Sequence, residues 1–220
     1  MKLKIILVLL SVLFSTYTFA QVNAPFLNEI QAFKQKDQQS MPASGGVLFL
    51  GSSSIRKWEN LEEVFKNYHA INRGFGGSQL NDAIYYADDI IFPYHPSQII
   101  IYSGENDIAA GVDPETVSDR FKILFNLIRK KMPEVSISFI SLKPSISREK
   151  FSPQFIYTNE LIKSFISNQQ NAHYIDVYQP MISDKEFKEM FLEDKLHMNQ
   201  KGYDIWTKSI TPYLKKNNLK

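Results

Sequence analysis

The sequence alternates five times between a short, almost wholly apolar run and a longer segment with helical spacing. A strand followed by a helix, repeated in this way, predicts a parallel sheet with helices on both faces. Because crossovers between parallel strands are right-handed, the sheet should be doubly wound. The expected strands are rich in Ile, Val and Phe, as in strands covered on both faces; they are Val47–Gly51, Ala70–Gly74, Gln98–Ser103, Val135–Leu142 and His173–Val177.

The helical segments follow the same order. Pro114–Lys131 has the clearest signal, because Asp113 can cap it, Pro114 takes its first position and apolar residues recur along one face. The other expected helices are Ala24–Gln35, Ile55–Phe65, Asn81–Ile91, Phe155–Asn168 and Lys201–Lys215. There is no internal repeat or low-complexity linker, so we expect one domain over residues 21–220.

The first 20 residues are expected to be a signal peptide. Lys2 and Lys4 form a charged start, Ile5 to Phe14 is an apolar run, and Thr18-Phe19-Ala20 ends on a small residue suited to cleavage. A membrane span needs about 20 apolar residues, so the run favours export over a stable span. We expect a periplasmic or extracellular protein after cleavage near Ala20, with a retained N-terminal anchor as the alternative.

Composition narrows the function. The chain has no Cys, which excludes disulfides and thiolate metal sites. It holds 25 Lys and Arg against 23 Asp and Glu; two of the lysines lie in the expected leader, which has no acid, so the remainder is formally neutral. A neutral chain argues against a nucleic-acid partner, which favours a basic face.

Polar residues follow the ends of the expected strands. Gly51-Ser52-Ser53-Ser54 comes directly after the first strand, where a serine is presented near helix N-terminal amides; the alternative is a simple serine cap. Gly74-Phe75-Gly76-Gly77 after the second strand would let backbone N–H groups approach an oxyanion, or would only form a tight turn. A dinucleotide fingerprint is excluded there, because Gln79 stands where a third spaced glycine is required.

Two further groups complete the set. Gly104-Glu105-Asn106-Asp107 follows the third strand: Asn106 can donate its amide to an oxyanion and Asp107 can brace the loop, unless the segment is merely a polar loop. Asp194-x-x-His197, near the C-terminus, supplies the base and the buried acid that a serine nucleophile needs. A metal at this pair would lack further close ligands. The other histidines, His69, His95 and His173, are expected to be structural or solvated.

These four groups share one edge of the predicted sheet, since sites in such sheets form outside the carboxyl ends of the strands. Together they resemble the conserved blocks of the SGNH hydrolases, or GDSL-like lipase/acylhydrolase family, over Val47 to Trp206. The resemblance implies a three-layer α/β/α sandwich of the flavodoxin-like type, with a five-stranded parallel sheet. It also implies ester hydrolysis without a cofactor or a metal.

The resemblance assigns roles residue by residue. It makes Ser53 the nucleophile, Asp194 and His197 its acid and base, and the Ser53 N–H, Gly77 and Asn106 the oxyanion hole. One departure from the family pattern is Ser52, which stands where the name-giving motif has Asp, so any bracing by that acid is absent.

The substrate is less constrained than the chemistry. Export and neutrality suit an esterase that removes acetyl groups from a glycan, and the resemblance equally permits lysophospholipid or short-chain acyl esters. Trp58, Phe75, Tyr102 and the loop Lys143–Pro153 are candidates to shape the pocket, although aromatic residues more often belong to the core. A module that binds a glycan or lipid without cleaving it is the non-enzymatic alternative.

Overall fold

A computed structural model describes residues 24–216; the expected signal peptide lies outside the described residues. Its centre is a five-stranded sheet in the order β2-β1-β3-β4-β5, with every neighbouring pair parallel. The strands are β1 (Val47–Gly51), β2 (Ile71–Gly74), β3 (Gln98–Tyr102), β4 (Ser136–Ile140) and β5 (Ala172–Ile175). The predicted fold class, a doubly wound α/β/α sandwich, is confirmed.

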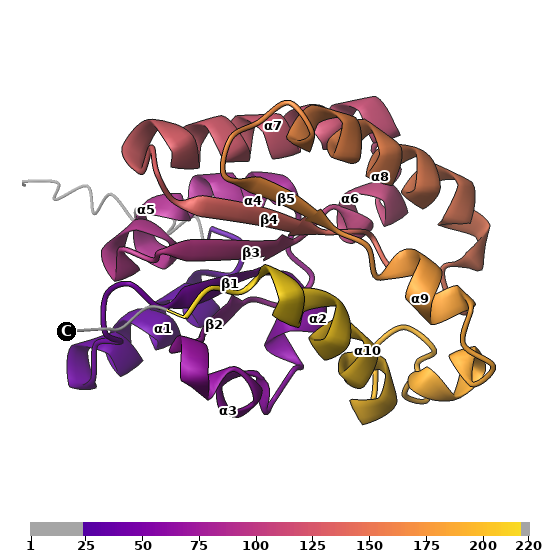
Figure 1. Cartoon of the computed structure of the whole chain (residues 1–220), viewed down its shortest axis with the longest axis horizontal. Coiled ribbons are helices and arrows are strands. Elements are labelled where there is room, and N and C mark those ends of the chain that lie inside the picture. Colours follow the sequence, from indigo (N-terminus) through magenta and orange to yellow (C-terminus); the bar gives the residue numbers. More distant parts are fainter. Residues whose placement is uncertain (1–23, 217–220) are drawn as a thin grey trace, which may run out of the picture.

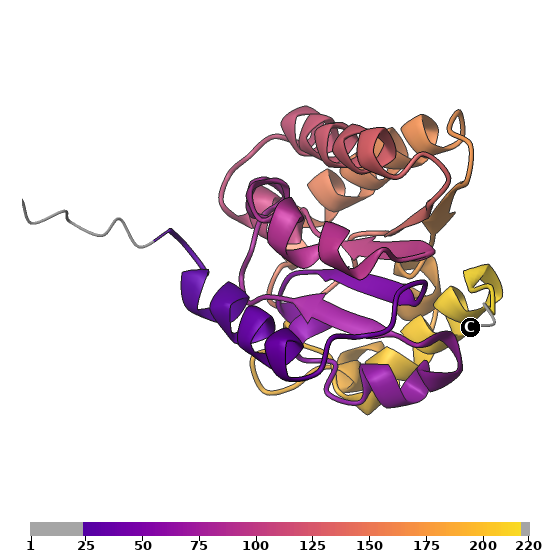
Figure 2. The same ribbon diagram turned by 90° about the vertical axis from the view of Figure 1, so that its left-hand side faces the viewer.

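Two separate cores lie on the two faces of the sheet. One face is covered by α1 (Leu27–Gln39), α4 (Leu80–Tyr85), α5 (Ala87–Ile90), α7 (Pro114–Lys131) and α8 (Ser152–Ile166). The other is covered by α2 (Ser53–Arg56), α3 (Leu61–Val64), α9 (Tyr178–Ile182) and α10 (Gln200–Ile210). Figure 1 shows α7 and α8 above the sheet with α10 and α3 below it, and Figure 2 shows indigo α1 and yellow α10 on opposite sides.

The strand boundaries agree with the sequence prediction to within two residues, and α7 agrees at both ends, with an explicit cap at its start. The predicted helices Ala24–Gln35 and Phe155–Asn168 are displaced, to Leu27–Gln39 and Ser152–Ile166. Asp113 accepts a hydrogen bond from the Thr116 N–H at 2.8 Å, and Pro114 opens the helix. The structure adds α6 (Glu105–Ala109) directly after β3. Short 3₁₀ turns lie at Lys66–Tyr68, Phe92–Tyr94, Glu149–Phe151, Phe187–Met190 and Thr211–Tyr213.

Three further predicted helices are divided or shortened. Ile55–Phe65 is two short helices, because the chain turns at Trp58 to bury its indole between Phe49 and Tyr203. Asn81–Ile91 divides at Tyr86 into α4 and α5. The last helix ends at Ile210, where a 3₁₀ turn containing Pro212 follows, since proline lacks the N–H that a continuing helix needs.

The three aromatic residues proposed as pocket-shaping candidates are core residues instead. Trp58, Phe75 and Tyr102 are all fully buried. Phe75 packs edge-on against Phe26 and Tyr86, in the core that includes α1, α4 and α5. They set the shape of the scaffold beneath the site, and none of them lies on its surface.

Candidate active site

Three of the predicted site residues follow three neighbouring strands. Ser53 is the first residue of α2, immediately beyond β1, while Gly77 and Asn106 follow β2 and β3. These strands are adjacent in the sheet, with β1 between the other two. Because all of them are parallel, their carboxyl ends meet at one edge, which is where ligands bind in doubly wound sheets.

The turn that presents Ser53 depends on a close backbone approach. A Cβ on Gly51 would lie 2.2 Å from the Tyr102 carbonyl oxygen, so only glycine fits there. Ser52 is extended, and its carbonyl accepts the N–H groups of Ile55 and Arg56, which starts the helix. Ser53 is half-buried, whereas its neighbours on both sides are only 3 % exposed.

The loop that carries His197 is folded by its own carboxylate. Asp194 Oδ1 accepts the backbone N–H groups of Leu196 at 3.0 Å and His197 at 2.9 Å. Lys195, directly after Asp194, adopts a left-handed conformation with φ 54°, and Leu192 N–H donates to the His197 carbonyl at 2.8 Å. The spacing Asp-x-x-His is therefore a compact local turn, which brings both side chains to the same side.

The two halves of the chain meet at this edge. His197 Nε2 lies 2.8 Å from Ser53 Oγ, and His197 Nδ1 lies 2.5 Å from Asp194 Oδ2. With Nδ1–H donating to the carboxylate, Nε2 is free to accept the Ser53 hydroxyl proton. The expected buried acid is wrong in one respect, because the Asp194 side chain is 43 % exposed, whereas His197 is 14 % exposed.

The electrostatics of Asp194 favour a permanent charge. Partial burial acts to raise its pKa, but hydrogen bonds from the His197 ring and from the His197 and Leu196 N–H groups outweigh it. They hold the pKa of Asp194 well below its ordinary range. A carboxylate in this position fixes the tautomer of the imidazole and stabilises the imidazolium.

Two backbone N–H groups at the same edge are free to bind a ligand. Within residues 24–216, neither the Ser53 nor the Gly77 N–H donates a hydrogen bond. Gly77 is exposed, and its φ of 74° is a left-handed conformation that suits glycine. A free N–H at Ser53 itself and another after the neighbouring strand are donors of the kind from which an oxyanion hole is built.

The Asn106 amide has one donor left. Its Oδ1 accepts from Arg148 Nη2 at 2.8 Å, and its Nδ2 donates to the Ser78 carbonyl at 3.0 Å. An amide nitrogen carries two hydrogens, so in the described part of the chain one of them has no acceptor. Of the two alternatives left open for Asp107, the structure shows the bracing one: its fully buried carboxylate accepts from Leu80 N–H at 3.2 Å and from Arg120 at 2.7 Å.

The sequence prediction did not identify a charged cluster behind Asn106. Lys143 and Arg148 both pair with Glu105 there, and Lys143 is fully buried. The one available signal was a lysine directly after the apolar run Val135–Leu142. Nothing in the spacing pairs Arg148 with Asn106, which lies 42 residues earlier in the chain.

The remaining histidines lie apart from this arrangement. His69 and His95 are exposed and occupy left-handed positions after short 3₁₀ turns, and His173 is half-buried in β5 against Tyr213. Among residues 24–216, no cluster of three or more His, Asp or Glu side chains is arranged to hold a metal ion. Nor does any helix in that range have the length and apolar character to cross a bilayer.

Comparison with known proteins identifies the family. Residues 45–205 match the family described as GDSL-like Lipase/Acylhydrolase. The chain belongs to this family. A search of curated proteins finds no match for the GDSL-like chain.

Solved structures share the fold of this GDSL-like protein at low identity. A protein from Streptococcus pneumonia, provisionally described as a platelet activating factor, has a TM-score of 0.74 at 20 % identity, covering 86 % of this chain and 92 % of that one. A GDSL-like lipase from Bacteroides thetaiotaomicron has a TM-score of 0.69 at 17 % identity, covering 83 % and 95 %. A catalytic mutant of an acetylxylan esterase from Geobacillus stearothermophilus has a TM-score of 0.64 at 12 % identity, covering 81 % and 98 %.

Proposed function

We propose that this GDSL-like protein is an exported serine esterase that cleaves carboxylic esters through an acyl-enzyme. The observation that carries the proposal is the 2.8 Å contact between Ser53 Oγ and His197 Nε2, with Asp194 on the opposite ring nitrogen. A nucleophile, a base in reach of its proton and a group that orients the base are the requirements for this chemistry. The expected leader supports export.

The reaction proceeds in two steps, acylation of Ser53 and hydrolysis of the acyl-enzyme. Ser53 Oγ forms a bond to the ester carbonyl carbon while its proton passes to His197 Nε2. The tetrahedral intermediate collapses, the bond to the alcohol oxygen breaks, and His197 returns the proton to the leaving alcohol. Water then attacks the acyl-enzyme with His197 as base, and the carboxylic acid is released with Ser53 regenerated.

Three donors would meet the oxyanion: the N–H groups of Ser53 and Gly77 and the free hydrogen of the Asn106 amide. In water-excluded sites such fixed donors are worth more than in solution, because they need no reorganisation as charge develops. Removing one typically lowers kcat by about 10²–10³-fold.

Serine substitutions test the assignment directly, since the chain offers matched controls on both sides of Ser53. Ser53→Ala should abolish hydrolysis of p-nitrophenyl acetate and leave the melting temperature unchanged. Ser52→Ala and Ser54→Ala alter buried hydroxyls next to it and should retain turnover. If either neighbour is the inactive variant, the nucleophile has been misassigned; a chelator should not change the activity of the unmodified enzyme.

For the substrate, we propose an acetylated carbohydrate. The proposal is supported by the expected export, by the formal neutrality of the chain once the expected leader is removed, and by the likeness in fold to the acetylxylan esterase. The competing substrate is a lysophospholipid or short-chain lipid ester, in keeping with the family description. A panel of acetylated sugars and p-nitrophenyl esters of rising chain length separates the two: a preference for acetyl sugars supports the proposal, and a kcat/KM that rises with chain length refutes it.

A further inference from the structure

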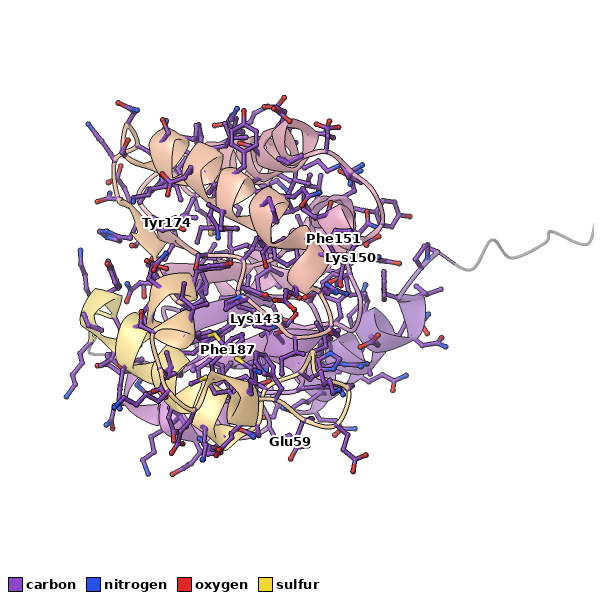
Figure 3. The ribbon with its side chains drawn as sticks, turned by 90° about the vertical axis from the view of Figure 1, so that its right-hand side faces the viewer. Glu59, Lys143, Lys150, Phe151, Tyr174 and Phe187 are labelled. Atoms are coloured by element: carbon purple, nitrogen blue, oxygen red, sulfur yellow. The ribbon has the colours of Figure 1, made fainter. Side chains whose placement is uncertain are left out.

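A buried ion cluster connects the two halves of the candidate site. Glu105 Oε1 lies 3.1 Å from Arg148 Nη1 and 3.4 Å from Lys143 Nζ, while its Oε2 accepts a short hydrogen bond from the Tyr102 hydroxyl. Lys143 and Glu105 are 0 % and 3 % exposed. Figure 3 shows Lys143 near the centre of the molecule, inside the ribbon.

Stability alone does not account for charges in this position. Moving an ion out of water carries a penalty of several kcal/mol, and apolar residues of similar volume often serve the fold equally well. Burial lowers the pKa of Lys143, although the neighbouring Glu105 carboxylate opposes that shift. Burial also raises the pKa of Tyr102 well above its ordinary value, as does the nearby charge of Glu105, which keeps the phenol a hydrogen-bond donor.

The outer contacts of the cluster indicate what it does. Arg148 uses Nη1 for Glu105 and Nη2 for the Asn106 Oδ1 atom, so one planar guanidinium joins the ion cluster to the oxyanion donor. Lys143 Nζ donates to the Leu196 carbonyl at 2.9 Å, directly before His197. In the same loop as Arg148, Ser147 N–H donates to the Lys195 carbonyl at 3.1 Å.

The contact at Oδ1 has two effects on Asn106. It fixes which end of the amide is oxygen, so that the Nδ2 group, with its free hydrogen, is kept on the side of Ser78. A cation that donates to the amide oxygen also polarises the amide, which strengthens its N–H as a donor. Lysine cannot reproduce this arrangement, because a single ammonium lacks the flat fork that reaches two acceptors at once.

We propose that Arg148 is a positioning residue for the oxyanion donor Asn106, and that the buried carboxylate of Glu105 holds Arg148 in place. Lys143 contacts the same carboxylate oxygen of Glu105 as Arg148 does, and it ties the cluster to the loop of His197. This inference rests on the proposed esterase function, because Asn106 acts on the reaction only if an oxyanion forms at Ser53.

A double-mutant cycle between Arg148 and Asn106 tests the proposal with p-nitrophenyl acetate, a neutral substrate. Arg148→Met should lower kcat by about tenfold or more and leave KM within about twofold, because the loss falls on the transition state. Asn106→Ala should lower kcat by about 10²–10³-fold. In the Asn106→Ala background, Arg148→Met should have almost no further effect, since its route to the reaction is already removed.

Arg129 is the matched control, because it is a partly buried arginine beyond the opposite ends of the strands. It donates to the carbonyls of Pro133, Val135 and Gln170. None of these three residues is a candidate site residue. Arg129→Met should lower the melting temperature and leave kcat unchanged. If Arg148→Met does not fold, Arg148→Lys enters the same cycle, with a smaller loss of kcat expected.

Three results would overturn the proposal. The first is an unchanged kcat in Arg148→Met, and the second is a change in this variant that falls on KM alone. The third is an Arg148→Met substitution that lowers kcat by the same factor in the Asn106→Ala background as in the unmodified protein, as a general structural defect would. Failure of the proposed function is distinguishable, because the unmodified protein would then show no turnover dependent on Ser53. If turnover depends on Ser53 but the effects of the Arg148 and Asn106 substitutions are independent of each other, only the role of Arg148 is refuted.

Discussion

Two buried arginine clusters in this protein have nearly the same chemistry and different connections. Arg73, on β2, donates to Tyr94 Oη at 2.6 Å and to Asp37 at 2.5 Å, and its guanidinium lies 4.4 Å from the centre of the Tyr94 ring. Arg148 likewise joins a carboxylate whose other oxygen accepts from a tyrosine. Each cluster combines a cation, a carboxylate and a phenol.

The difference lies in what else each cluster touches. The Arg73 cluster joins α1 to β2 and to the turn at Tyr94, and its described contacts include none of the candidate site residues. The Glu105 cluster reaches Asn106 and the carbonyl before His197. We infer that the first holds the fold together and the second orients the site, so damage to each should appear in a different measurement.

The largest effect on kcat should come from His197, the proposed base, whose loop the Glu105 cluster contacts. His197→Ala removes the base and should lower kcat by about 10⁴-fold or more. Stability should change far less, because the hydrogen bonds of its ring are to Ser53 and to the exposed carboxylate of Asp194. Steady-state kinetics and thermal unfolding measure the two quantities. A His197→Ala variant with near-normal turnover would contradict the account of the site.

Arg73→Met should give the opposite pattern. It leaves the Asp37 carboxylate, which is 12 % exposed, without its cation, and breaking such a buried pair costs about 3–5 kcal/mol of stability. The kcat of the molecules that remain folded should be unchanged. Urea unfolding together with kinetics measured well below the unfolding midpoint checks both; a fall in kcat would remove the distinction between the clusters.

Glu105→Gln should affect both measurements. The glutamine keeps the shape and some of the hydrogen bonds, so the stability loss should be smaller, about 1–3 kcal/mol. Arg148 loses its anchoring charge, and kcat should fall by about tenfold as the Asn106 amide loosens. If only stability changes, the Glu105 cluster is a structural device like that of Arg73.

The smallest effect concerns the pH dependence of stability. A carboxyl whose pKa is lower in the folded state contributes stability above its unfolded pKa, about 3.9, and loses that contribution as the pH falls through its folded pKa. The stability advantage of the unmodified protein over Asp194→Asn should therefore be present at pH 6 and shrink below about pH 4. Because Asp194 is 43 % exposed, solvent limits the difference to about 0.5 kcal/mol or less. A stability advantage of the unmodified protein that grows as the pH falls would contradict the lowered pKa of Asp194.

The sequence predicted those parts of the fold that depend on local patterns. Period and composition indicated the strands, and the Asp113 cap with Pro114 gave the first residue of α7. The break between α2 and α3 was not predicted, because it comes from burial of Trp58 against residues almost 150 positions later in the chain. Tertiary packing decides such breaks, and helical spacing alone does not contain them.

A similar limit applies to the site. Ser53, Gly77, Asn106 and the Asp194–His197 pair were singled out because each sits at a strand or loop end with a local pattern, and the structure brings them to one edge. The roles assigned to them remain predictions. Arg148 could not be singled out, since its relation to Asn106 exists only once the loop after β4 folds over the end of β3.

Covalent labelling can show whether Ser53 is a nucleophile activated by His197. The folded protein is treated with a fluorophosphonate, digested, and the modified residue located by mass spectrometry, with His197→Ala treated in parallel. We expect one adduct, on Ser53, and a much slower reaction in His197→Ala. An adduct on another residue, equal labelling of both proteins, or no labelling of the folded protein would contradict this expectation.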